Sequence, residues 1–576
     1  MYDALVFLRF HRLALRCIVK MSIFSFLVLL PLNYTGGGGA NAVDIQGYVV
    51  SLFVTDFLRF TMANVAGGSP RLWVHCFAAY LLTAIVVREL LVEYETFNSI
   101  RHCYLLSREP HLRTVLVTNI PRHLRSPNKI SAYFTHVYPN AVKHVVMCQN
   151  LVYLEALVAK RTTLLANIEQ ELLLLPIRSA AALDSEGHIE DHINEVTDKA
   201  FVVMRTFAAA TIAIQSMHSS KPGAMQVSSA PEPRDVLWSN VYVSKGATRT
   251  RSILGEFLVI LIISFYIIPV ALVSLLVSEQ ALVSSSPRLA QLDQATALFS
   301  SVIALVQPLC IMLMQQILPP LFMAIGRLEG LVCFSDIQMR AFSRYFLFQV
   351  LNVFLVTTIA GSIFDTIATI VEKPEEALLM LGNSLPRMSS FFITFVTIKT
   401  FFGLGLELVR TMSLLQATIR VFVIPNATLR TARRVVCGLR AIDDPGWFPF
   451  HKILAQDMLV VVISVVFAVV APLVLLPCAL FCLFSRIMWT HHHLYVYESV
   501  FESGGQFWPK IFRRFVFGLI IAQMTITGQF ILKEARHEAY ATVALMFMTY
   551  LFLRSTRARY DPTSSTLPLE VATVMD

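Results

Sequence analysis

Ten apolar runs dominate this sequence, and most are long enough to cross a lipid bilayer. A membrane-spanning helix needs about 20 predominantly apolar residues. Runs of this kind occupy residues 13–32, 72–91, 252–277, 298–325, 345–370, 389–409, 454–471, 473–489, 512–532 and 539–553. The pattern predicts an all-α polytopic membrane protein with about ten transmembrane helices.

Charged residues are too few for a soluble protein of this size. Of the 576 residues, 56% are hydrophobic and 15% are charged, whereas a soluble domain carries about 25% charged residues. The formal net charge is +9, but the Lys and Arg residues lie in loops between apolar runs, so we expect no nucleic-acid partner. The sequence contains no P-loop, zinc-protease motif, paired C-x-x-C or nucleophile elbow, which indicates no enzyme, cofactor or metal site. Nine cysteines, several of them inside apolar runs, predict no disulfide framework.

The Lys and Arg residues also predict an orientation. They concentrate in the loops after the fourth, sixth and eighth runs, so alternating spans place these loops, both termini and the long polar region on the cytoplasmic side. The expected domains are residues 1–93, with two transmembrane helices; 94–250, a cytosolic domain; 251–553, eight helices; and 554–576, a cytosolic tail. Two alternatives stay open: a signal peptide over the first run, and one kinked helix across residues 472–477. On the outer side, Asn33-Tyr34-Thr35 is a glycosylation sequon.

The polar region has the composition of a soluble domain. Its pattern predicts strands at residues 114–119, 143–147, 200–204 and 225–228, and helices at 126–136, 151–175 and 208–217. This order is close to a ferredoxin-like or RNA-recognition-like α+β fold whose second helix is enlarged. The strand at 200–204 lacks the glycine and most of the aromatic residues on which RNA bases stack, which disfavours RNA binding.

Polar side chains inside the later runs are the candidate functional residues. Burying such groups in hydrocarbon is costly unless they face water or a partner. The set comprises Glu256, Gln307, Gln315, Gln316, Gln349, Asn352, Lys399 and Glu407, all in the third to sixth runs. They predict the walls of a polar pathway. The alternative is that their hydrogen bonds only hold the helices together.

The sixth run carries the most specific signals. Gly403 and Gly405 each weaken a helix by about 1 kcal/mol relative to alanine and mark a candidate gating hinge, although glycine also occurs at close helix contacts. Glu407, one turn further, is expected at the cytoplasmic mouth, where a carboxylate concentrates cations. Lys399 lies about 12 Å from Glu407 along the helix axis. Its charge opposes cation passage unless a side chain on another helix neutralises it.

Five stretches are distinctive enough to suggest a family. They are GGSPRLWVH at residues 67–75, TVLVTNIP at 114–121, PEPRDVLWSN at 231–240, ILPPLFMAIGRLEG at 317–330 and RYFLFQVLNVF at 344–354. In sequence and in order they resemble the OSCA and calcium-permeable stress-gated cation channels, with their transmembrane protein 63 relatives. The resemblance extends over nearly the whole chain, and the segment at 231–240 is its most specific part.

The resemblance implies an anoctamin-like fold of eleven spans, with a cytosolic RNA-recognition-like domain after the third span and a pore within each subunit. The implied pore helices are residues 252–277, 298–325, 345–370, 389–409 and 454–471. The chain is expected to lack the family's first span, because residues 3–9 match the linker that follows it, and this match also argues against a signal peptide.

The resemblance also implies roles for single residues. Glu407 matches an acidic position near the pore mouth, and Gly403 with Gly405 matches a flexible gating helix. Lys399 falls where plant members carry an acid, which puts calcium selectivity in doubt. Residues 414–440 match a segment that runs along the inner leaflet.

Together these features predict a mechanosensitive or osmosensitive, non-selective cation channel that is calcium-permeable and gated by membrane tension. Its expected partners are membrane lipids, the permeating cations calcium, potassium and sodium, and a second copy in a homodimer. The expected location is the plasma membrane, with an intracellular membrane as the alternative. Two other functions stay open: a phospholipid scramblase of the same fold, and a structural relative that does not conduct.

Overall fold

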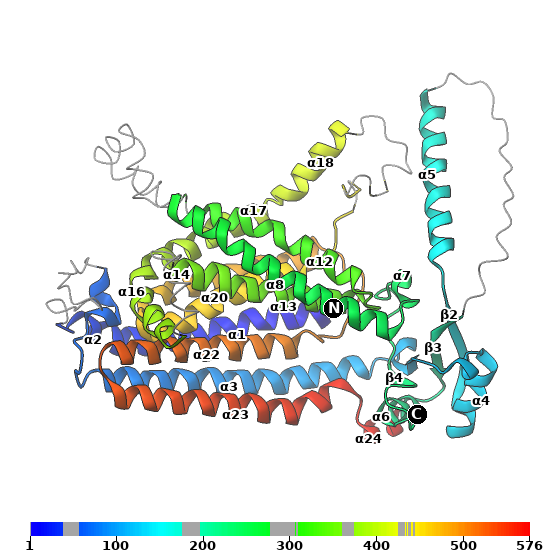
Figure 1. Cartoon of the computed structure of the whole chain (residues 1–576), viewed down its shortest axis with the longest axis horizontal. Coiled ribbons are helices and arrows are strands. Elements are labelled where there is room, and N and C mark those ends of the chain that lie inside the picture. Colours follow the sequence, from blue (N-terminus) through cyan, green and yellow to red (C-terminus); the bar gives the residue numbers. More distant parts are fainter. Residues whose placement is uncertain are drawn as a thin grey trace.

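The computed structural model describes residues 2–37, 57–174, 196–276, 306, 309–359, 374–423, 433, 435, 439–441 and 444–576. Long helices lie side by side in a bundle, and a small sheet domain sits at one end of it (Figure 1). Both ends of the chain lie at that same end of the bundle. This arrangement has the shape expected of a membrane domain with an inserted α+β domain.

The helices of the bundle follow the predicted apolar runs. They are α1 (Tyr2–Phe24), η1 (Ser25–Leu29), α2 (Leu30–Tyr34), α3 (Leu72–Leu105), α8 (Lys245–Leu276), η7 (Gln315–Ile317), α12 (Leu318–Leu328), α13 (Phe334–Phe348), η8 (Gln349–Val356), α14 (Thr357–Ile359), α16 (Pro374–Ile398), η10 (Lys399–Gly403), α17 (Leu404–Leu408), α18 (Thr411–Val423), α20 (Phe450–Val470), η11 (Pro472–Val474), α21 (Leu475–Tyr495), α22 (Trp508–Leu532) and α23 (Arg536–Ser565).

Eight helices among the described residues are long and apolar enough to cross a membrane. The described parts of the other two predicted runs also lie on helices. One is the continuous helix formed by α13, η8 and α14, and the other is α23. The apolar part of α23, residues 539–553, is shorter than the roughly 20 residues that a bilayer requires. The predicted fold class, a polytopic helical membrane protein with an inserted α+β domain, is confirmed.

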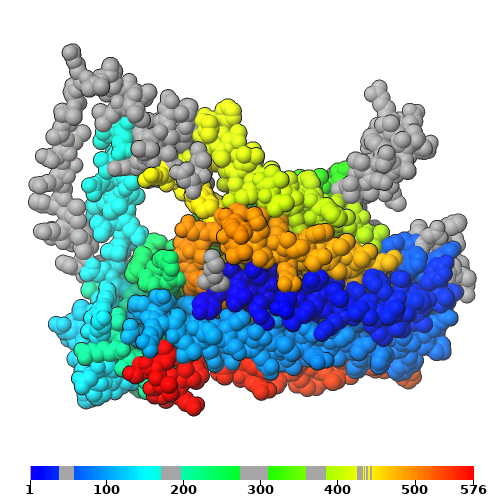
Figure 2. Space-filling model, turned by 180° about the vertical axis from the view of Figure 1, so that it is seen from behind, coloured from blue at the N-terminus to red at the C-terminus, as the bar shows by residue number. Residues whose placement is uncertain are grey.

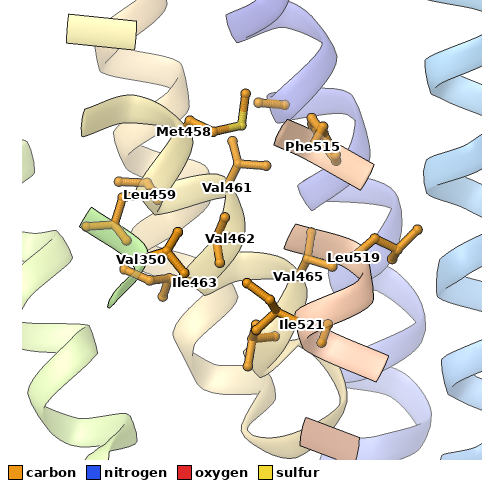
Figure 3. Packing of buried hydrophobic residues seen from close by; sticks show 14 of the residues in the cluster. Val350, Met458, Leu459, Val461, Val462, Ile463, Val465, Phe515, Leu519 and Ile521 are labelled. Atoms are coloured by element: carbon orange, nitrogen blue, oxygen red, sulfur yellow. The ribbon is translucent and has the colours of Figure 1, made fainter. Parts of the chain in front are cut away.

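Helix α20 lies at the centre of the bundle. Nearly all of its residues are buried, including Val461, Val462 and Ile463. Figure 3 shows these side chains between α22, which supplies Phe515 and Leu519, and the helix that carries Val350. A helix that is apolar on every side is stable only when neighbours cover every side, which explains why this run shows no amphipathic period.

The link at residues 472–477 separates two helices. The non-helical backbone of Ala471 (φ −145°, ψ 82°) ends α20, and Pro472 begins the short helix η11 that leads into α21. Because proline lacks an amide hydrogen, it suits the first turn of a helix better than its interior. The alternative of one kinked helix is therefore wrong.

The sheet domain has the predicted order of elements. Its strands are β1 (Thr114–Thr118), β2 (Val142–Gln149), β3 (Val196–Met204) and β4 (Gln226–Ser229), and its helices are α4 (Pro127–Val137), α5 (Val152–Leu174) and α6 (Phe207–Gln215). The strands are ordered β2-β3-β1-β4, and every neighbouring pair is antiparallel. Alternate residues such as Val115, Val117 and Val202 point into a core shared with Ile130 and Phe134 of α4. This is the strand order of a ferredoxin-like fold.

One detail of the predicted domain is wrong. Helix α5 is not an enlarged second helix of the ferredoxin-like fold, because α6 occupies that position against β1, β3 and β4. Instead, α5 stands away from the sheet as an insertion between β2 and β3 (Figure 1). Its apolar residues Tyr153, Val158 and Leu164 are each more than half exposed, at 57%, 54% and 52%. Residue periodicity predicted the helix but not where it packs.

The segment PEPRDVLWSN at residues 231–240 connects the sheet domain to the bundle through hydrogen bonds. The Asp235 carboxylate accepts hydrogen bonds from the amide and the hydroxyl of Ser335, at 2.7 and 2.5 Å, in the first turn of α13. Asn240 donates to the carbonyl of Leu331 at 2.9 Å. Burial raises the pKa of Asp235 to about 6. The segment therefore joins the sheet domain to one of the long helices.

The C-terminal residues form a second contact between the two parts. Helix α24 (Leu569–Met575) packs on α6, and the carboxylate of Asp576 accepts hydrogen bonds from the amides of Phe207 and Ala208 at 2.7 and 2.8 Å. An acidic group is favourable there because the first amides of a helix lack partners. Figure 2 shows this C-terminal segment in red against the sheet domain.

The sequon at Asn33 does not offer a free side chain. Asn33 is fully buried, donates to the carbonyl of Phe60 at 3.2 Å, and its amide oxygen lies 2.8 Å from Nε2 of His75. A glycan on this nitrogen would break the first contact and could not fit. The expectation of glycosylation at Asn33 is therefore wrong for the folded chain.

Candidate functional site

A cavity of about 260 Å³ lies between η7, the segment from η10 to α18, and the first turns of α20. Trp489 and Tyr497 also contribute to its wall. Five residues predicted from the sequence line the cavity: Gln315, Gln316, Lys399, Gly403 and Glu407. The structure thus brings together predicted residues from two of the apolar runs, 298–325 and 389–409, and adds residues of a third helix, α20.

The other predicted residues lie elsewhere. The Glu256 carboxylate is more than half exposed and pairs with Arg344 at 2.7 Å. Gln349 and Asn352 are fully buried at helix contacts, where Gln349 donates to Gln315 at 2.9 Å and Asn352 to the carbonyl of Ile263 at 3.1 Å. Gly405 is not among the lining residues of the cavity, and Gln307 lies outside the described residues. A permeation role for these residues stays a prediction.

The cavity wall includes a local change of helix type. Residues Lys399–Gly403 form a π-helix, η10, and the amide of Leu404 bonds to the carbonyl of Lys399 five residues earlier. Such wide turns are rare and are found frequently at functional sites. After α17 the chain turns at Arg410, whose φ of +55° ends the helix. Both features lie on the candidate gating helix.

Lys399 has a partner on another helix. Its ammonium lies 3.2 Å from Oδ1 of Asp457 on α20, donates to the carbonyl of Gln456, and sits 4.8 Å above the ring of Phe481. The second carboxylate oxygen of Asp457 lies 3.0 Å from Nε2 of His11 on α1. The condition set by the sequence, a neutralising side chain on a neighbouring helix, is met.

Glu407 lies eight residues after Lys399 on the same continuous helix. Its carboxylate accepts a hydrogen bond from the Tyr497 hydroxyl at 2.6 Å. Burial, with the nearby Glu407 charge, raises the pKa of Tyr497. Arg410 stacks over the Tyr497 ring at 5.1 Å and donates to the carbonyl of Pro445 at 2.8 Å. The wall near Glu407 therefore carries both signs of charge, with the acid held in place by a phenol.

Two amide side chains of the cavity wall indicate that the cavity holds water. Nε2 of Gln315 and Oε1 of Gln316 are buried and have no hydrogen-bond partner among the described protein groups. Buried polar atoms without protein partners are generally satisfied by water. The wall of this cavity is mostly apolar, but it carries amide and charged side chains, and such groups can hold water and ions at membrane depth.

Sequence reasoning missed three residues of this site. Asp457 is a lone acid inside the apolar run 454–471, and that isolation was the signal that could have found it. His11 precedes the first apolar run and Tyr497 follows the eighth. Neither has a local pattern that indicates a role, because each is brought to the site by helix packing.

Three family models match three successive parts of the chain. Residues 251–530 match one described as a calcium-dependent channel, 7TM region. Residues 2–93 match one described as "Late exocytosis, associated with Golgi transport". Residues 112–183 and 181–240 match one described as the cytosolic domain of a 10TM protein. The first description ends with the words "putative phosphate", and the third reads in full "Cytosolic domain of 10TM putative phosphate transporter".

Curated relatives match along the whole chain. The hyperosmolality-gated Ca²⁺ permeable channels 1.3 and 1.5 of Arabidopsis thaliana are 27% and 26% identical, over 100% of this chain and 78% and 79% of their own lengths. The CSC1-like protein ERD4 of Brassica juncea is 25% identical over 99% of this chain and 82% of its own length. Together with the three colinear family models, these relatives show that the chain belongs to the OSCA, or calcium-permeable stress-gated channel, family.

Proposed function

We propose that this protein is an osmosensitive, calcium-permeable, non-selective cation channel. Its Arabidopsis relatives are named as hyperosmolality-gated Ca²⁺ permeable channels. The observation that carries the proposal is a cavity between apolar helices whose wall includes the polar side chains of Gln315, Gln316, Lys399 and Glu407. Its unbonded amide groups favour a hydrated path, and a hydrated path is what an ion needs to enter the membrane.

The proposed stimulus is membrane tension, which osmotic swelling or shrinkage changes. Tension shifts a conformational equilibrium only by the work that it does on the difference in membrane area between the two states. The candidate moving part is the helix α16–η10–α17, because a π-helix and two glycines lie in succession on it. Bending there would widen the cavity at the level of Lys399 and Glu407.

The proposed topology places the sheet domain and both termini in the cytoplasm and the protein in the plasma membrane. It is supported by the Lys- and Arg-rich loops and by the position of both chain ends beside the sheet domain (Figure 1). Helix α18 projects from the bundle and exposes Leu414 and Phe422 at 61% and 80%. This suits contact with the inner leaflet. A homodimer is also proposed from the family resemblance.

The test is recording from purified protein in liposome patches under stepped suction, with the native chain, Glu407→Gln and Glu256→Gln. Glu256→Gln tests the other acid that the sequence predicted on the pathway, which pairs with Arg344 and is not among the cavity-lining residues. We expect stretch-activated cation current in all three and a lower conductance in Glu407→Gln alone. No current from the native chain at any sub-lytic tension would refute tension gating.

A second arm separates osmotic gating and lipid transport from tension-gated conduction. Hyperosmotic shock of cells that express the native chain is expected to raise cytosolic calcium. The same liposomes, labelled with fluorescent phospholipid, report scrambling. Lipid transfer between leaflets without ion current would refute the channel function and show that the protein is a scramblase.

A further inference from the structure

A buried network of three side chains connects α1 to the cavity. Lys399 of η10 contacts Asp457 of α20 at 3.2 Å, and Asp457 contacts His11 of α1 at 3.0 Å. The exposed fractions of the three residues are 9%, 4% and 1%. Lys399 and Asp457 line the cavity, whereas His11 is not among its lining residues.

Each contact fixes the carboxylate of Asp457. One oxygen faces the Lys399 ammonium, and the other faces Nε2 of His11, whose Nδ1 lies 3.2 Å from the carbonyl of Phe7. A neutral ring that carries its hydrogen on Nε2 donates it to the carboxylate, and Nδ1 then makes no hydrogen bond to the carbonyl of Phe7. Contacts with η10 on one side and with α1 on the other thereby fix the carboxylate of Asp457. The surroundings are buried, and an unpaired charge is strongly disfavoured there.

This geometry changes what a permeating cation meets at the level of Lys399. A lysine alone on a pore wall repels cations. A lysine paired with a carboxylate presents a nearly neutral dipole, whose field falls off much faster with distance than that of a single charge. The ring of Phe481 and the carbonyl of Gln456 hold the ammonium on the side of Asp457.

We propose that Asp457 is a selectivity-determining residue, which cancels the charge of Lys399 on the cavity wall and so permits cations to pass. His11 is a positioning residue, which acts through Asp457. The inference rests on the proposed channel function and adds to it the residue that sets charge selectivity.

The experiment measures reversal potentials of the stretch-activated current in the native chain, Asp457→Asn, Lys399→Met and the double variant. A sodium chloride gradient gives the cation-to-anion permeability ratio, and calcium against sodium gives the calcium ratio. We expect Asp457→Asn to lower the cation-to-anion ratio at least fivefold, because a bare ammonium then faces the path. Lys399→Met is expected to raise the calcium-to-sodium ratio at least twofold, and the double variant to return within twofold of native.

Glu329→Gln is the matched control. Glu329 is a buried acid, 1% exposed, that pairs with Arg340 at 2.6 Å and is not among the cavity-lining residues. Its loss should weaken the fold without moving either reversal potential. For His11, the hydrogen-bonding variant His11→Gln should shift the potential less than His11→Leu, a difference that a purely structural role would not produce.

The outcomes separate the two proposals. Two results would overturn the role of Asp457 and leave the channel function standing. One is a native current whose reversal potentials are unchanged in Asp457→Asn and Lys399→Met. The other is a change of the reversal potential in the same direction in both variants. Absence of native current would overturn both. If Asp457→Asn does not fold, Lys399→Met and the double variant decide, because removal of the lysine alone must raise the calcium ratio and removal of both must restore it.

Discussion

Alanine at Gly405 probes whether the helix α16–η10–α17 must bend for the channel to open. A Cβ atom at Gly405 would meet no heavy atom within 4 Å, and one at Gly403 would meet only ordinary contacts, at 3.4 Å from Met312 and 3.7 Å from Lys399. Because neither alanine clashes, the main effect is on the backbone. Alanine favours the helix over a distorted state by about 1 kcal/mol per site.

This free energy translates into a change in gating. An energy of about 1 kcal/mol alters an equilibrium constant about fivefold. If opening unwinds or bends the helix at Gly405, Gly405→Ala should lower the open probability about fivefold at a fixed tension at which the native open probability is low. Stepped suction on liposome patches measures this directly, and the midpoint tension should rise.

Gly518→Ala is the control for a packing effect. A Cβ atom there would lie 2.9 Å from Cγ2 of Val462, where α22 crosses α20. Overpacking of this kind costs about 1–3 kcal/mol, so this variant should lower the melting temperature in detergent. A Gly405→Ala protein that is as stable as native or more so, yet opens at the native midpoint, would refute bending at this position.

Two further predictions concern residues outside the cavity. Because burial raises the pKa of Asp235 to about 6, above its ordinary 3.8, the folded state binds this proton more tightly than the unfolded state. The stabilisation of the folded state is full below pH 4 and is lost as the pH rises through 6, by up to about 3 kcal/mol. In thermal melts from pH 4 to 8, the melting temperature of the native protein should therefore fall with pH more steeply than that of Asp235→Asn. Equal slopes in the two proteins would contradict this prediction. At Asn33, treatment with peptide N-glycosidase should leave the electrophoretic mobility of the protein unchanged. Asn33→Ala should lower the stability of the folded state by about 1–3 kcal/mol, because Phe60 and His75 lose their partner. A mobility shift that Thr35→Ala abolishes would show instead that the site is glycosylated.

Much of the secondary structure could be predicted from the sequence because the signals are local. Apolar runs near bilayer length marked the helices, and short apolar runs rich in valine marked β1 and β3. The lengths and order of these elements follow from residues adjacent in the chain. Where α5 packs could not be predicted this way, because the same apolar residues are compatible with a helix packed on the sheet and with a helix that stands away from it.

The candidate site divides along the same line. Glu407, Lys399 and the glycines could be identified from the sequence, because polar groups and glycines are conspicuous within apolar runs. Which of the polar residues share one cavity depends on helix rotation and on neighbours hundreds of residues away. Glu256 was as conspicuous as Glu407, yet it faces Arg344 away from the cavity.

The sequence by itself determined that this chain is a polytopic membrane protein with an inserted α+β domain, and that a lysine and a glutamate lie on one candidate gating helix. Only the tertiary structure decided what surrounds that lysine. His11 and Asp457 are 446 positions apart, and they meet because α1 and α20 pack together in the bundle. The charge that an ion meets at Lys399 is a sum over atoms close in space, and no local pattern of residues contains that sum.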